Sequence, residues 1–179
     1  VKDMTYAVFV RSPHAHAKIV GIDTAAAKSA PGVVDVLTGA DLATDKIGGL
    51  ICGWMIHSQD GTPMKAGAHP AIAHDRVRHV GDQVAIVIAE TREQARDAAE
   101  LVEVDYEVLP SVTDPAKALD ASAPTLHDVA PNNLIFDWTL GDKEATDAAF
   151  AKAAHVVALD PPATGAHAPS RRRVATVVP

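Results

Sequence analysis

Two histidines stand one residue apart near the start of the chain, in the stretch VRSPHAHAKI at 10–19. Imidazole is a common metal ligand, and residues i and i+2 of an extended strand share a face, so His14 and His16 could supply two ligands of one site. A zinc site needs three or four converging ligands, and nothing near this pair completes the set. We interpret both histidines as part of a turn after Ser12 and Pro13. None of the other seven fits a Cys/His or His-Glu-x-x-His ligand pattern: His57, His69, His74, His79, His127, His155 and His167.

No other pattern predicts a complete catalytic site. Cys52, the single cysteine, lies beside Trp54 in a glycine-rich stretch without an obvious base, so we expect an unreactive thiol. The stretch GDQV at 81–84 has one glycine and is no phosphate loop, and SRRR at 170–173 is typical of a charged tail. We therefore expect no catalytic, cofactor-binding or metal-ligating residue. Three carboxylates alternate on a predicted strand, which indicates a solvated face: Glu103, Asp105 and Glu107.

Apolar and β-branched runs predict the strands that would position these residues. The first two runs, on either side of the Ser-Pro-His corner, read as neighbouring strands joined by a turn, and TGADL at 38–42 reads as a turn. The run at 83–89 is continuously apolar, as in a buried strand. Strands are expected at 5–10, 17–22, 33–37, 76–81, 83–89, 101–110, 133–140 and from about 155.

The clearest helix is predicted over 91–102. Thr91 and Gln94 have capping-box spacing, and an alanine-rich apolar stripe includes Ala95 and Ala98. Shorter helices are expected at 23–32, capped by Asp23, at 113–119, capped by Asp114, and from Asp142 onward. Strands and helices alternate, but several strands are adjacent, so the pattern predicts an α+β fold with a mixed sheet.

Composition excludes some classes of protein. The net charge of −7 argues against nucleic-acid binding, which normally shows a basic face. No apolar run approaches the ~20 residues that span a bilayer, and no signal peptide is visible. One cysteine allows no internal disulfide and fits a cytoplasmic protein. The chain starts with Val1 and not Met, so we expect a fragment of a longer protein.

Two regions depart from the regular pattern. Residues 43–70 hold seven glycines and prolines together with Ile47, Leu50 and Ile51, an unusual composition for a solvent-facing loop. We expect this stretch to be mobile or to self-associate when the chain is alone, and to be covered in a larger enzyme. The alternative is that the loop folds back and buries these side chains in its own domain. The amino-acid composition changes at residues 161–179. We interpret them as an irregular, disordered tail, which leaves one domain at 1–160.

Three stretches resemble a known family: AVFVRSPHAHAKIVGIDTAAAKSAPGVVDVLTGADL at 7–42, RVRHVGDQVAIVIAETREQARDAAELVEVDYEVLPSVTDP at 76–115 and APTLHDVAPNNLIFDW at 123–138. They are similar to the N-terminal α/β-hammerhead domain of molybdenum hydroxylase large subunits, the xanthine dehydrogenase and aldehyde oxidase family, and within it to aerobic-type carbon monoxide dehydrogenase large chains. The resemblance implies a mixed sheet flanked by helices with a protruding β hammerhead.

The resemblance also implies cofactors and partners outside this chain. The whole large subunit would bind a molybdopterin dinucleotide in a C-terminal region, and companion subunits would carry FAD and [2Fe-2S] clusters. The reaction class would be hydroxylation of a heterocycle or aldehyde, or oxidation of CO. The family continues after a strand like HVVALD with an Asn-Arg segment and Glu-Pro-Arg, whereas PPATGAHAPSRRR stands here, which suggests a truncated or frame-shifted end. The alternative is a stand-alone, non-enzymatic module that binds a partner or small ligand.

Overall fold

The structure is a computed structural model that describes residues 4–157. The chain forms two compact units. The first, which we call the sheet unit, comprises, of the described residues, 4–53, 66–111 and 126–129. The second, which we call the hairpin unit, comprises 54–65, 112–125 and, of the described residues, 130–157. The predicted boundary at residue 160 lies outside the described residues and stays a prediction.

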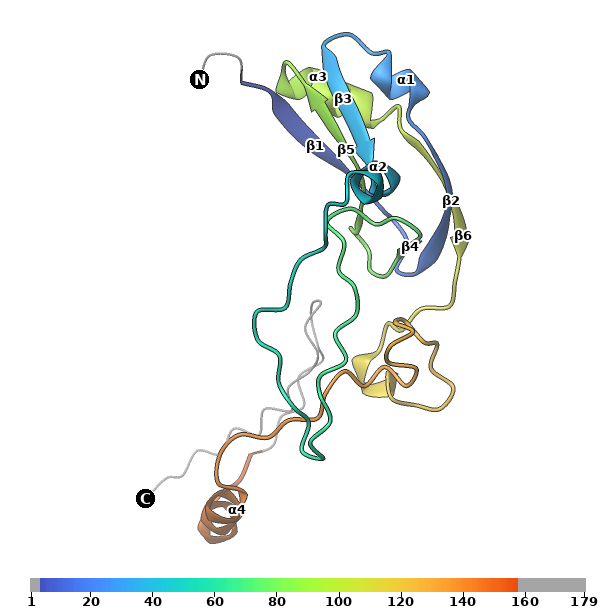
Figure 1. Ribbon diagram of the computed structural model, residues 1–179. Coiled ribbons are helices and arrows are strands. Elements are labelled where there is room, and N and C mark those ends of the chain that lie inside the picture. Colours follow the sequence, from blue (N-terminus) through green and yellow to red (C-terminus); the bar gives the residue numbers. More distant parts are fainter. Residues whose placement is uncertain (1–3, 158–179) are drawn as a thin grey trace. The chain divides into compact units, whose positions relative to one another are not determined.

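One three-stranded sheet has the order β1-β5-β3 and is antiparallel throughout (Figure 1). Its strands are β1 (Tyr6–Arg11), β3 (Val33–Thr38) and β5 (Gln83–Ala89). The central strand β5 is the continuously apolar run of the sequence, and its Ala85 and Val87 are fully buried. They pack with Val36 and Ala98 in one core cluster, so this sheet and the helix after it share a core.

The second sheet has the order β4-β2-β6, also antiparallel. Its strands are β2 (Ala17–Asp23), β4 (Arg76–Val77) and β6 (Glu103–Val108). Ala17, Val77 and Val84 form a second buried cluster, to which β5 contributes Val84. The register between β2 and β6 shifts between Ile19 and Gly21.

The predicted helix at 91–102 forms as α3 (Arg92–Ala99) with the expected capping box: Gln94 N donates to Thr91 Oγ1, and Thr91 N donates to Gln94 Oε1. Ala95 and Ala98 are buried, as the apolar stripe predicts. The other helices are short, and Asp114 and Asp142 cap the last two as expected. They are α1 (Ala25–Lys28), α2 (Gly39–Thr44), the 3-10 helix η1 (Pro115–Lys117) and α4 (Lys143–Lys152).

The α+β class is confirmed, but the expected pairing of the first two strands is wrong. β1 and β2 belong to different sheets. At the corner between them, Ser12 N donates to Asp82 O at 2.9 Å, and Gly81 N donates to Ser12 O at 2.8 Å. These bonds tie the corner to the turn before β5 instead of folding β2 back on β1.

The expectation of a mixed sheet is also wrong for the strands that the structure describes, because each of their pairings is antiparallel. A parallel pair within one sheet needs a crossover connection. The α3 helix instead links β5 of one sheet to β6 of the other. The connection therefore joins two sheets and creates no parallel neighbour.

Other local predictions need correction. Residues 38–42 begin the helix α2, because the Asp41 carboxylate accepts hydrogen bonds from Thr38 N and Oγ1, both at 2.7 Å. Only 76–77 of the run 76–81 is strand. Residues 133–140 and 153–157 are not strand, and the remainder of the predicted last strand lies outside the described residues.

The hairpin unit is held by isolated hydrogen bonds. Met64 N donates to Ile56 O and Ser58 N to Thr62 O, which closes a hairpin around the bridge between His57 and Pro63. The segment at 134–140 runs beside it, because Lys65 N donates to the carbonyl of residue 135 at 3.0 Å and Gln59 N to that of residue 137 at 2.8 Å. Spaced contacts of this kind fix the segment without forming a ladder.

Candidate functional site

His14 lies in a turn built around Ser12. The backbone N–H of His14 donates to Ser12 Oγ at 3.0 Å, and the buried Ser12 hydroxyl lies 3.2 Å from the His14 carbonyl oxygen. The His14 ring packs edge-on against Tyr106, with ring centroids 4.9 Å apart. Burial is the main cause that raises the pKa of Tyr106, the nearby Asp82 raises it further, and a hydrogen bond with Ser12 opposes both. The phenol therefore stays protonated and acts as a packing surface.

His16 has different neighbours. Its side chain is 4% exposed, and its Nδ1 lies 2.7 Å from the carbonyl oxygen of Pro110. A carbonyl oxygen only accepts, so Nδ1 carries the hydrogen and donates it. The buried Nε2 has no hydrogen-bond partner within the described part of the chain. The two histidines at i and i+2 are thus held by separate contacts.

His127 is the centre of a group of basic side chains that the sequence did not predict. Burial is the main cause that lowers the pKa of His127, and the Arg78 guanidinium is the next. His69 and His16 lower it slightly as well, while Asp128 raises it. Arg78 is fixed nearby, because its Nε donates to the Leu126 carbonyl at 2.9 Å. The Arg78 guanidinium therefore disfavours a second cation at this place.

Residues 4–157 bring together no three His, Cys, Asp or Glu side chains that could hold a metal ion. The donor groups of this part of the chain therefore do not fit a metal centre. Cys52 is exposed and outside any such group.

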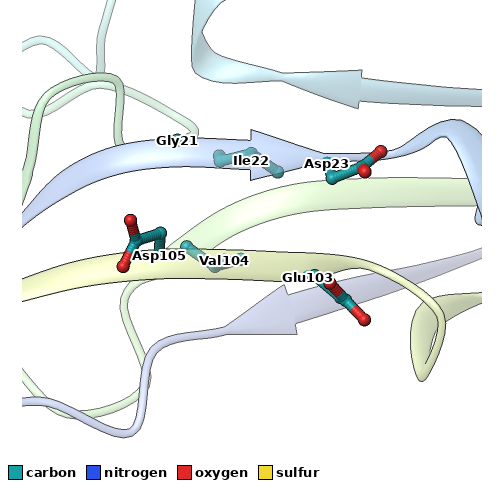
Figure 2. Close-up of a pocket in the computed structure, with 6 residues that line it drawn as sticks. All are labelled: Gly21, Ile22, Asp23, Glu103, Val104 and Asp105. Carbon is teal, nitrogen blue, oxygen red and sulfur yellow. The ribbon is translucent and has the colours of Figure 1, made fainter.

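An open depression of about 470 Å³ lies on the β2 and β6 strands, where the register shifts. Figure 2 shows that its carboxylates point in different directions. Asp23 Oδ1, on β2, accepts a hydrogen bond from Ala25 N at 2.8 Å, and Glu107, on β6, forms an exposed ion pair with Lys18 at 3.0 Å. These contacts describe a solvated sheet face. The lining residues are Gly21, Ile22, Asp23, Glu103, Val104 and Asp105.

Large apolar side chains are exposed along the irregular stretch, as its composition suggests. In the sheet unit, Ile51 is 93% exposed, and Ile47 and Leu50 are also exposed. In the hairpin unit, Trp54 is 72% exposed and meets Trp138 edge-to-face, with ring centroids 5.9 Å apart. The alternating apolar residues at 134–140 were the sequence signal for this contact, but we interpreted them as a strand.

Within residues 4–157, no helix is long and apolar enough to cross a membrane. The chain matches the family model "Aldehyde oxidase and xanthine dehydrogenase, a/b hammerhead domain" over residues 1–110. It is 44% identical to the carbon monoxide dehydrogenase large chain of Afipia carboxidovorans, covering 88% of this chain and 19% of the relative. It is 39% identical to the nicotine 6-hydroxylase large subunit of Paenarthrobacter nicotinovorans, covering 97% of this chain and 20% of that one.

Solved structures agree with these relatives. The CO dehydrogenase from Oligotropha carboxidovorans has a TM-score of 0.67 at 41% identity, over 87% of this chain and 20% of that chain. The quinoline 2-oxidoreductase from Pseudomonas putida 86 has a TM-score of 0.64 at 36% identity, over 88% of this chain and 19% of that chain. The chain spans about a fifth of the length of the relatives that it matches.

Proposed function

Because the chain belongs to the aldehyde oxidase and xanthine dehydrogenase family through its a/b hammerhead domain, we propose that it acts as the N-terminal structural domain of a molybdenum-cofactor-dependent oxidoreductase large subunit. One observation carries this proposal: most of the chain aligns with only a fifth of relatives that are large subunits of such enzymes. The whole enzyme would hydroxylate a heterocycle or an aldehyde, or oxidise CO, and the chain alone would be inactive.

The cofactors of such an enzyme would lie elsewhere. The described residues contain no donor group suited to a metal ion, so no step is assigned to them. A molybdopterin dinucleotide would be held by a C-terminal molybdenum-binding region of the large subunit, and it would supply the oxygen-transfer chemistry. By family resemblance, an FAD subunit and an iron-sulfur subunit would complete a cytoplasmic enzyme.

The role that we propose for this chain is structural. Two antiparallel sheets share β5 side chains through adjoining core clusters, which gives the sheet unit a close-packed interior. The apolar side chains at 47–55 are exposed, and their burial against another part of an enzyme would be favourable. A close-packed sheet unit and exposed apolar side chains suit a domain that is built into a larger polypeptide.

A domain exchange tests the proposal. The homologous segment of the carbon monoxide dehydrogenase large chain of Afipia carboxidovorans is replaced by this chain, and the hybrid is expressed with its companion subunits. We expect assembly on size-exclusion chromatography and molybdenum bound in proportion to the hybrid. A large chain with the segment deleted is the control. A hybrid that fails to assemble just as the deletion does contradicts the proposed function.

A further inference from the structure

We propose that an aromatic patch of the hairpin unit, formed by Trp54, Met55, Phe136, Trp138 and Leu140, docks against the large-subunit polypeptide that extends beyond the shared segment in the relatives. This inference rests on the proposed function and names the surface through which the domain would be fixed. All five side chains are exposed, with Trp138 at 42% and Trp54 at 72%.

The patch has a defined geometry. The planes of Trp54 and Trp138 meet at 76°, the edge-to-face arrangement that aromatic pairs prefer. Phe136 and Leu140 stand two positions to either side of Trp138 in the same segment, and both are exposed apolar residues. The segment is attached to the hairpin by the Gln59 side chain, whose Nε2 donates to Asp137 Oδ1 at 3.0 Å, and by the backbone bonds given above. The tryptophans are therefore presented by a hydrogen-bonded framework.

The hairpin unit has almost no interior of its own. Among the hydrophobic residues that are buried in the described part of the chain, only Ala130 belongs to this unit. Fixing a backbone costs about 1–2 kcal/mol per residue, and burial of apolar surface is the main compensation. A unit that exposes two tryptophans and fully buries only one alanine among its described residues has little of this compensation. An apolar surface outside the unit is needed to supply it.

The length of the relatives indicates which polypeptide would cover the patch. The alignment with the nicotine 6-hydroxylase large subunit includes 97% of this chain, so the patch lies inside the shared segment. Four-fifths of that relative lies outside the segment, within the same polypeptide. A covalently linked surface meets the patch at a high effective concentration and pays less entropy than a separate partner would. Aromatic anchors of this kind are the side chains that most often carry binding energy.

The experiment uses hydroxyl-radical footprinting with mass spectrometry, which reads Trp54 and Trp138 separately. They are the two tryptophans of the chain. Labelling is compared between the isolated chain and the hybrid enzyme described above. We expect strong labelling in the isolated chain and loss of most of that labelling in the hybrid, because anchor side chains at the centre of an interface are fully desolvated.

Two variants of the hybrid provide a second measurement. Trp138→Ser should reduce the yield of assembled enzyme by about tenfold, the scale expected for loss of an aromatic anchor. Val20→Ser is the matched control, because Val20 is a comparably exposed apolar residue of the sheet unit, and its hybrid should assemble normally.

The outcomes separate the two proposals. A hybrid that assembles and binds molybdenum, yet labels both tryptophans as strongly as the isolated chain does, overturns the docking surface and leaves the proposed function standing. Weak labelling in the isolated chain also overturns it, since the patch is then already covered. A hybrid that does not assemble overturns the proposed function, and the docking surface with it.

Discussion

His16 donates a hydrogen bond from Nδ1 to the carbonyl of Pro110, 94 residues further along the chain, at 2.7 Å. The backbone reinforces this contact, because Leu109 N donates to the His16 carbonyl at 2.9 Å. The two bonds join the residue before β2 to the segment after β6. His16 therefore closes one end of the β4-β2-β6 sheet.

We expect His16→Ala to lower the free energy of unfolding by about 2–4 kcal/mol, since it removes a buried ring and leaves the Pro110 carbonyl without its donor. Urea denaturation followed by circular dichroism measures the change. His14→Ala is the control: His14 is partly exposed and loses mainly its contact with Tyr106, worth about 0.5–1.5 kcal/mol. Equal losses of unfolding free energy in both variants would mean that the contact of His16 with Pro110 contributes no more stability than the contact of His14 with Tyr106.

Ala98→Leu should destabilise the sheet unit by about 1–3 kcal/mol, because Ala98 is fully buried in the core cluster and a larger side chain would overpack it. Arg96→Leu places the same side chain on the exposed side of α3 and should change stability little. Denaturation midpoints of the two variants are compared. Similar shifts would show that the helix packs through another face.

Gly32→Ala should cost about 1–3 kcal/mol. The backbone of Gly32 has φ +74°, which strains any residue with a Cβ. The added Cβ would also lie 2.2 Å from Gln94 Nε2 and displace the side chain that caps α3. Gly21→Ala is the matched control, since no atom lies within 4 Å of its Cβ position. Thermal unfolding measures both, and a Gly32→Ala protein as stable as Gly21→Ala would contradict the argument.

Burial and Arg78 lower the pKa of His127 from its ordinary value of 6.5. Between the lowered folded value and 6.5, the unfolded chain holds more protons than the folded chain. The free energy of unfolding therefore rises with pH through this window and is lost on acidification. His127→Gln should flatten this dependence in denaturation curves taken from pH 5 to pH 8. Asp128→Asn should extend the window to lower pH, because Asp128 opposes the shift. An unchanged slope in His127→Gln would refute the assignment.

The isolated chain should bind neither zinc with high affinity nor molybdenum. No three ligand side chains converge among residues 4–157, and His14 and His16 are held by separate contacts. Calorimetric titration with zinc and elemental analysis of the purified protein are the measurements. A sub-micromolar zinc site that disappears in the His14→Ala, His16→Ala double variant, or stoichiometric molybdenum, would disprove this.

Local sequence signals predicted the elements whose contacts are local. The capping box of Thr91 and Gln94 and the caps Asp114 and Asp142 depend on residues two or three positions apart, so their spacing is visible in the sequence. The partner of β1 was not visible, because β5 lies more than 70 residues away and the intervening corner at Ser12 determines which strand it meets. The helix α2 was missed because TGADL offers turn residues and a capping pair at once.

The candidate sites also divide into local features that the sequence predicted and long-range contacts that it did not. Spacing alone led us to predict that His14 and His16 do not complete a zinc site, but it could not predict that His16 reaches Pro110. The group around His127 joins residues from three distant stretches, and the Trp54–Trp138 contact joins two. Such groupings depend on long-range contacts that a single sequence does not encode as a local pattern.

The long interval between β2 and β6 bears on the order of folding during synthesis. The β1-β5-β3 sheet can close once residue 89 has left the ribosome, whereas β2 must wait for residues 103–108 before its second neighbour exists. Until then one edge of β2 is a row of unpaired backbone groups on the nascent chain. Chains emerge at about 5–20 residues per second, so this edge stays open for several seconds. Arrest of translation between β4 and β6 would expose that edge to neighbouring nascent chains and make this interval the most aggregation-prone stage of biosynthesis.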